Sequence, residues 1–303
     1  MDTRDHPPAH ARALDIFKGV ATTSVMRDRT NNEDAQRVHL LKPPGGRTEI
    51  AGVMEVLSDW VLWLGKLFFA VGGLAAGVGV LRATPPGGRA GSHALGVGAI
   101  FIGGIGVGLF PVAARLPDSL GGYSIWLTAE ALMRTGVALL GFFLWRVFRP
   151  GSGAALAGAV GCVALLFGTL AWDQAVQPRW WQYDYALASA CAAQFAFSVP
   201  FAWSAVETAL EWRRSRRRVA LGLADRRVSH RFLLWCVATS AFAGICLLAI
   251  FVGWLGAHGQ VEVAAAARLV RGLLYFVIVG SLWLGLSPPA FYRRRFFSSP
   301  PPA

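Results

Sequence analysis

The chain has 303 residues, of which 54% are hydrophobic and only 15% are charged, and its mean hydropathy is +0.47. A single soluble core needs far fewer apolar residues, so the composition indicates an integral membrane protein. A net charge of +12 is also found in proteins that bind nucleic acids. Here the arginines lie in particular loops beside apolar runs, so we interpret the charge as a topology signal and expect no nucleic-acid partner.

Residues 1–55 are rich in Pro, Gly, Arg, Asp and Glu and have no sustained apolar periodicity, which predicts a disordered N-terminal tail. The segment has no cationic stretch followed directly by an apolar run, so it is not typical of a signal peptide. Met54 stands immediately before the first apolar run. The alternative is therefore that translation starts at Met54 and that residues 1–53 are not made.

Seven apolar runs of about 20 residues follow, and each is long enough to cross a hydrocarbon core of roughly 30 Å. They predict an all-α bundle of seven transmembrane helices within residues 56–290, followed by a short cytoplasmic tail at 291–303. The predicted spans are 60–81, 94–113, 124–147, 154–172, 185–210, 232–255 and 264–286.

The distribution of arginine predicts the orientation of these spans. If the C-terminus is cytoplasmic, the outer loops hold only Arg115 and Arg179, and the inner segments hold fifteen arginines. Basic residues are retained on the cytoplasmic side, so we expect the N-terminus outside and the C-terminus inside. The inner arginines are Arg82, Arg89, Arg146, Arg149, Arg213, Arg214, Arg216, Arg217, Arg218, Arg226, Arg227, Arg231, Arg293, Arg294 and Arg295.

Small residues within the spans predict close helix packing. Gly73 and Gly77 are four residues apart in the first span, where they let a neighbouring backbone approach closely. We expect packing inside one chain, with a dimerisation face as the alternative. Pro111 and Pro200 lie inside the second and fifth spans and predict kinks there.

The connection between the fifth and sixth spans carries a basic run at 213–218. We expect the fifth helix to continue into the cytoplasm and end near Gly222, with Asp225 as the cap of the sixth helix. A polybasic segment at this position favours contact with anionic lipid headgroups at the inner face. Docking of a cytoplasmic signalling partner is the alternative.

Charged residues inside the spans are the candidate site, because each is costly in a membrane unless it has a partner. Glu130 and Arg134 are four residues apart, so they share a helix face and are expected to pair. Together with Lys66, Arg268 and Arg271 they lie in the predicted outer half of the membrane. One hypothesis is an outward-opening pocket in which a small anionic ligand binds to the four basic residues Lys66, Arg134, Arg268 and Arg271, while Glu130 holds Arg134 in place. The alternative is a set of structural ion pairs and snorkelling side chains.

Two further features lie near the predicted membrane surfaces. Glu207, at the inner end of the fifth span, is expected to pair with Arg231 or Arg146, or to act as a switch that holds the fifth and sixth helices together. The outer segment 172–184 is rich in aromatic residues and is interpreted either as a lid over the pocket or as an interfacial anchor.

The predicted spans lack the residues that metal binding, retinal attachment and serine catalysis require. No histidine lies inside a predicted span, and the four cysteines all fall inside spans without the spacing of a metal site, so we expect no metal and no cofactor. The seventh span has no lysine that could form a retinal Schiff base. Ser281 has no histidine partner at membrane depth, and the candidate acid–base groups Glu130 and Glu207 are predicted near opposite membrane faces, so we expect that the protein is not an enzyme. The four cysteines are Cys162, Cys191, Cys236 and Cys246.

The segment 207–235 contains ALE at 209–211, the arginine cluster, LGLAD at 221–225 and RFLLW at 231–235. It resembles a segment of bacterial seven-helix membrane proteins, some of which are similar to the membrane sensor regions that precede histidine kinases and nucleotide cyclases. In that pattern a Pro-Val-Val-Asn stretch follows the aspartate, whereas this chain has RRVSH at 226–230. The resemblance implies no reaction and no particular site residue.

These observations predict a multi-pass protein of the bacterial inner membrane with a stand-alone sensor or receptor-like role. A small transporter or channel is the alternative, since glycine-rich helices that contain proline are compatible with both classes. Transporters of the alternating-access type carry internal repeats, and we find no clear repeat in this sequence.

Overall fold

The structure is a computed structural model that describes residues 49–84, 90–116, 119–176, 187–286, 289–290 and 292. The chain divides into two units, Met1–Gly52 and Val53–Ala303, and apart from the first four residues of α2 (Glu49–Ala83) the helices lie in the second. Within the described residues the secondary structure is helical, and seven helices are long and apolar enough to cross a membrane. The prediction of seven apolar spans is thereby confirmed.

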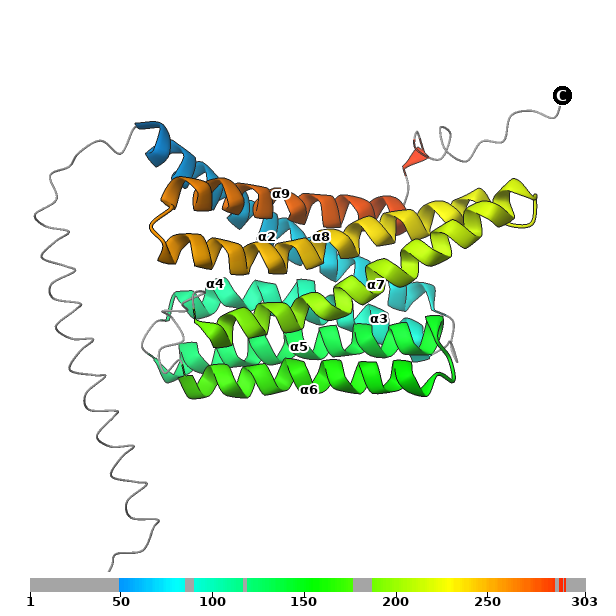
Figure 1. The fold of residues 1–303 in the computed structure, drawn as a ribbon, viewed down its shortest axis with the longest axis horizontal. Helices are drawn as coiled ribbons and strands as arrows, with labels where there is room; N and C mark the ends of the chain where they lie inside the picture. The colour runs from blue at the N-terminus through cyan, green and yellow to red at the C-terminus, as the bar shows by residue number, and fades with distance from the viewer. Residues whose placement is uncertain are drawn as a thin grey trace, which may run out of the picture. The chain divides into compact units, whose positions relative to one another are not determined.

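The second span consists of three consecutive segments, whereas each of the other spans is one continuous helix (Figure 1). All seven predicted ranges overlap the observed helices, most of which extend past the predicted ends. The helices are α2 Glu49–Ala83, α3 Ala90–Ala99, the π-helix η1 Ile100–Val107, α4 Gly108–Ala114, α5 Leu120–Phe148, α6 Gly153–Val176, α7 Ala188–Ala220, α8 Arg226–Ala257 and α9 Val261–Leu286.

Helix α2 begins earlier than the sequence predicted. The sequence predicts residues 49–55 as part of the tail, but in the structure they form the first turns of α2, and residues 1–48 lie outside the described part of the chain. The early start brings Glu55 and Asp59 onto the same helix as Lys66. Asp59 and Glu55 thus lie about two and three turns before Lys66 on this helix.

Helices α7 and α8 extend together past the ends of α5 and α6 (Figure 1). At 33 residues, α7 is about 50 Å long, well beyond a hydrocarbon core of roughly 30 Å. It ends at Ala220, and Gly222 follows with a φ of 71°. The Asp225 carboxylate accepts a hydrogen bond of 2.8 Å from the Arg227 backbone N–H. The predicted end of the fifth helix and the predicted cap of the sixth are both confirmed.

Glycines allow α2 to pack closely against two neighbours. A Cβ on Gly73 would lie 2.7 Å from the Gly103 Cα, and one on Gly77 would lie 2.6 Å from the Gly96 carbonyl oxygen. On its other side, a Cβ on Gly65 would lie 2.7 Å from the Gly272 carbonyl oxygen of α9. Gly73 and Gly77 therefore pack helices within one chain, as predicted.

The outer surface of the bundle is strongly apolar. Trp60, Val160 and Leu247, on three different helices, are each at least half exposed. The core instead contains tightly packed aromatic rings, among them Phe201 and Phe242, whose centroids are 3.8 Å apart. Large apolar side chains that face outward on long helices are suited to lipid rather than water.

Candidate functional site

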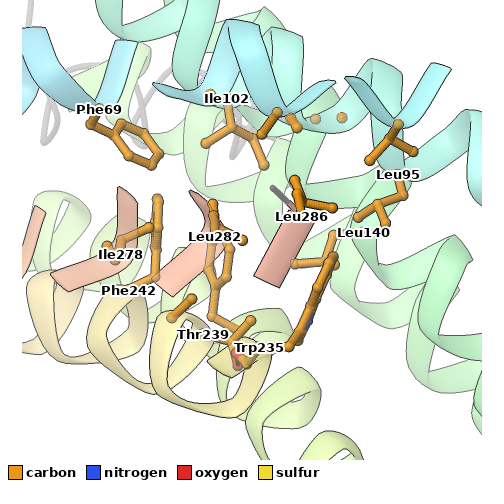
Figure 2. Close-up of a pocket in the computed structure, with 18 residues that line it drawn as sticks. Phe69, Leu95, Ile102, Leu140, Trp235, Thr239, Phe242, Ile278, Leu282 and Leu286 are labelled. Carbon is orange, nitrogen blue, oxygen red and sulfur yellow. Dashed lines mark hydrogen bonds between the residues drawn. The ribbon is translucent and has the colours of Figure 1, made fainter. Parts of the chain in front are cut away.

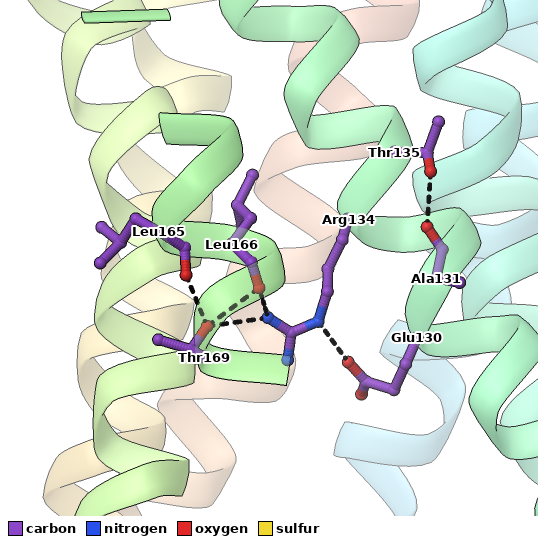
Figure 3. A network of polar contacts seen from close by, with 7 residues as sticks. All are labelled: Glu130, Ala131, Arg134, Thr135, Leu165, Leu166 and Thr169. Carbon is purple, nitrogen blue, oxygen red and sulfur yellow. Dashed lines mark hydrogen bonds and ion pairs between the residues drawn. The ribbon is translucent and has the colours of Figure 1, made fainter. Parts of the chain in front are cut away.

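Arg134, in the middle of α5, is 1% exposed, and its guanidinium group has partners on α5, α6 and α7, of which Figure 3 shows those on α5 and α6. Its Nε lies 3.2 Å from the Glu130 carboxylate, which confirms the predicted pair. Its Nη1 donates to the Leu166 carbonyl and, at 3.0 Å, to the Thr169 hydroxyl of α6. The Phe197 ring of α7 lies 5.0 Å from the guanidinium carbon. The Arg134 guanidinium group thus has partners on α5, α6 and α7.

A second buried acid belongs to the same region. Asp173, near the end of α6, is 1% exposed and accepts a hydrogen bond of 2.8 Å from the Ser189 hydroxyl of α7. The negative charge of Asp173 interacts electrostatically with the Glu130 carboxyl group. Asp173 is not among the predicted site residues. The available signal was its position four residues after Thr169, one turn along an otherwise apolar helix.

Arg268 of α9 faces two carboxylates of α2. Its Nη2 lies 3.8 Å from the Glu55 carboxylate and its Nε lies 3.8 Å from that of Asp59. Both distances allow an ion pair but are too long for a hydrogen bond. Within the described residues, these two buried nitrogens have no hydrogen-bond partner. The two carboxylates attract the Arg268 guanidinium group, but its Nε and Nη2 atoms donate no hydrogen bond to them.

Lys66 and Arg271 lie near each other because α2 and α9 cross at glycines. Lys66 follows Gly65, and Arg271 precedes Gly272, the two glycines whose backbones approach closely. Lys66 is half-buried and Arg271 is 9% exposed. Lys66 interacts electrostatically with the charges of both Arg271 and Asp59.

The five predicted site residues therefore fall into two groups of contacts. Glu130 and Arg134 belong to a polar network among α5, α6 and α7. Lys66, Arg268 and Arg271 belong to a cationic group on α2 and α9, which Glu55 and Asp59 join. In the first group, Arg134 has its partners within the network. In the second group, the Nε and Nη2 atoms of Arg268 donate no hydrogen bond.

Glu207 of α7 pairs with a different arginine from those predicted. Its Oε1 lies 2.9 Å from the Arg149 Nε and accepts a hydrogen bond of 3.2 Å from the Trp203 indole. The hydrogen bond and the negative charge of Glu207 raise the pKa of Arg149. Arg231 is exposed, and within the described residues neither Arg231 nor Arg146 forms an ion pair with Glu207, so Arg149 takes the place of both predicted partners. The reason is the turn after α5, which places Arg149 beside α7, an arrangement that spacing along the sequence does not reveal.

An apolar cavity lies among six of the spans, with about 720 Å³ of empty space including its open part. Figure 2 shows part of its wall, with Phe69 on α2, Ile102 on η1, Leu140 on α5 and Ile278 on α9. None of the predicted site residues lines it. Sequence reasoning missed this cavity because its wall consists of ordinary core residues.

The aromatic loop that was interpreted as a lid or anchor begins at Trp172 and Asp173 on α6, but its residues 177–184 lie outside the described part of the chain. Among the described residues there is no group of three or more His, Cys, Asp or Glu side chains that could hold a metal ion.

Comparisons of the chain with models of protein families, with curated proteins and with solved structures found no match. The class of protein therefore follows from the fold and composition. Seven apolar helices with outward-facing hydrophobic side chains are those of a multi-pass membrane protein.

Proposed function

We propose that this multi-pass membrane protein is a stand-alone sensor or receptor-like protein that binds a small anionic ligand at the cationic group of Lys66, Arg268 and Arg271. The observation that carries the proposal is the Arg268 guanidinium, which has two buried nitrogens without hydrogen bonds and two carboxylates at 3.8 Å. Three cations face two carboxylates here, so one positive charge is in excess.

The chemistry of the group suits a carboxylate or a phosphate. The Nε and Nη2 atoms of an arginine form one edge of the guanidinium fork, which binds two oxygens of such an anion at once. A ligand at this edge has to displace the Glu55 and Asp59 carboxylates, and it then exchanges two ion pairs of 3.8 Å for two short, charge-assisted hydrogen bonds. Low polarity around the helices strengthens that attraction compared with water.

The proposed orientation supports access of this ligand from outside. Arg268 and Arg271 lie in the N-terminal half of α9 and Lys66 lies at the middle of α2, and the arginine distribution favours an outer position for the N-terminal ends of both helices. We place the protein in the bacterial inner membrane, with its N-terminus outside and its C-terminus inside. Nothing in the proposed role requires catalysis, so the protein is proposed to be a receptor and not an enzyme.

The cytoplasmic extension of α7 supports the proposed contact with anionic lipids. All five arginines within 213–218 are exposed, and Arg216 lies 5.3 Å from the Trp212 ring. Each basic residue near an anionic surface contributes about 1 kcal/mol. The same segment is the proposed docking position for a cytoplasmic signalling partner.

A small transporter or channel is the second candidate, and the second span favours it. That span changes from α-helix to π-helix at Ile100, returns to α-helix at Gly108 and then contains Pro111. Irregular helices at membrane depth accompany substrate sites in transporters. Flux of an anion into proteoliposomes would favour this second candidate over a purely sensory role.

The binding proposal is tested with purified protein in nanodiscs and a panel of acetate, succinate and inorganic phosphate. We expect at least one anion to raise the melting temperature saturably, and we expect Arg268→Gln to weaken that effect at least tenfold. Arg115→Gln is the matched control, since Arg115 is an exposed arginine outside the group. The proposal fails if no anion acts on the unaltered protein, or if the two variants respond alike.

A further inference from the structure

The described residues that line the apolar cavity offer no free polar side chain to a polar ligand. The cavity's two polar lining side chains are Thr239 and Trp235. The Thr239 hydroxyl lies 3.0 Å from the Trp235 carbonyl oxygen, and the Trp235 indole donates to the Ser204 hydroxyl at 3.0 Å. Because water needs two or more polar partners to stay in a cavity, this one is suited to hydrocarbon.

The cavity is separated from the cationic group by aromatic rings. Phe69, one turn after Lys66 on α2, lies 5.5 Å from the Phe242 ring and 5.4 Å from the Tyr275 ring, measured between centroids. These three side chains are at most 8% exposed. At the other end of the cavity Leu286 is 42% exposed, so the lining reaches the surface of the bundle there.

We infer that this cavity binds the hydrocarbon chain of a membrane lipid. The lining comes from membrane-spanning helices, so the molecules that can reach it are those of the bilayer. This site is distinct from the proposed anion site, and neither depends on the other.

Several small side chains line the cavity. Ala76, Ala99 and Ala238 stand at lining positions where larger side chains would fill the cavity. Atoms that face an empty space lose their van der Waals contacts, which lowers the stability of the bundle. A flexible hydrocarbon chain restores those contacts without needing any hydrogen bond.

The test uses vesicles of phosphatidylcholine that carries a photoactivatable diazirine at the end of one acyl chain. After irradiation, mass spectrometry locates the labelled residues of the full chain. We expect labelling at cavity-lining positions such as Thr239 and Leu282. Labelling confined to outward-facing residues such as Leu247 and Trp283 would overturn the inference.

Two neighbouring alanines of α2 provide a matched pair of variants. Ala76 lines the cavity, whereas Ala75 is exposed and does not line it. We expect Ala76→Leu to reduce labelling of Thr239 at least fivefold and Ala75→Leu to leave it unchanged. Ala238→Met fills the same space from α8, and a thermal melt of each variant verifies folding. Equal labelling in folded cavity variants and in the control would contradict the inference.

Discussion

A buried arginine inside a membrane helix is costly unless its charge and its donors are matched. Arg134 meets this requirement with a carboxylate on its own helix, a carbonyl and a hydroxyl on α6, and an aromatic face on α7. Arg268 does not, since two of its nitrogens lack hydrogen bonds. The same residue type thus has a structural role at one position and supports a proposed ligand site at the other.

This difference predicts the effect of removing Arg134. We expect Arg134→Ala to lower the free energy of unfolding by about 3–5 kcal/mol, because Glu130 then remains buried without its partner. Arg115→Ala, at an exposed position, is expected to change it by no more than about 0.5 kcal/mol. Reversible unfolding in mixed micelles measures both values. Similar values for the two variants would show that the network does not stabilise the fold.

The pairs that could be predicted from the sequence are those within one helix. Glu130 and Arg134 are one turn apart, so their contact follows from helical geometry alone. The partners of Glu207 and Asp173 come from other elements, namely the turn at Arg149 and Ser189 of α7. Their identity depends on how the helices pack, which the spacing of residues does not encode.

At the scale of the helices, the crossing of α2 and α9 determines where the cationic group forms. Gly65 and Gly272 let the two backbones approach, and the residues beside them are Lys66 and Arg271. The apolar spans and their caps could be predicted from composition and local signals. The π-helical segment could not, because it depends on how the second span packs against α2 and α5.

We expect Gly65→Ala to lower the free energy of unfolding by about 1–3 kcal/mol, because its Cβ would lie 2.7 Å from the Gly272 carbonyl oxygen. Gly79→Ala is the control on the same helix, where a Cβ meets nothing within 4 Å. That change is expected to stabilise α2 by up to about 1 kcal/mol through helix propensity. Thermal unfolding of both variants compares them, and a Gly65→Ala protein as stable as the control would refute close packing at this crossing.

At the scale of the whole molecule, the account depends on which side of the membrane the cationic group faces. Spans α5, α6 and α7 lie between Arg115 and Arg214, so these two arginines must be on opposite sides of the membrane. The arginine distribution favours the outer side for Arg115 and the inner side for Arg214. The N-terminal parts of α2 and α9 then lie on the outer side with Arg115.

The most direct test is the labelling of single cysteines with a membrane-impermeant maleimide, after the four native cysteines are replaced by alanine. We expect Arg115→Cys to react in intact cells and Arg214→Cys to react only after the membrane is opened. Reaction of Arg214→Cys in intact cells, with Arg115→Cys protected, would invert the bundle. It would place Lys66, Arg268 and Arg271 at the cytoplasmic side and contradict an outward-facing receptor site.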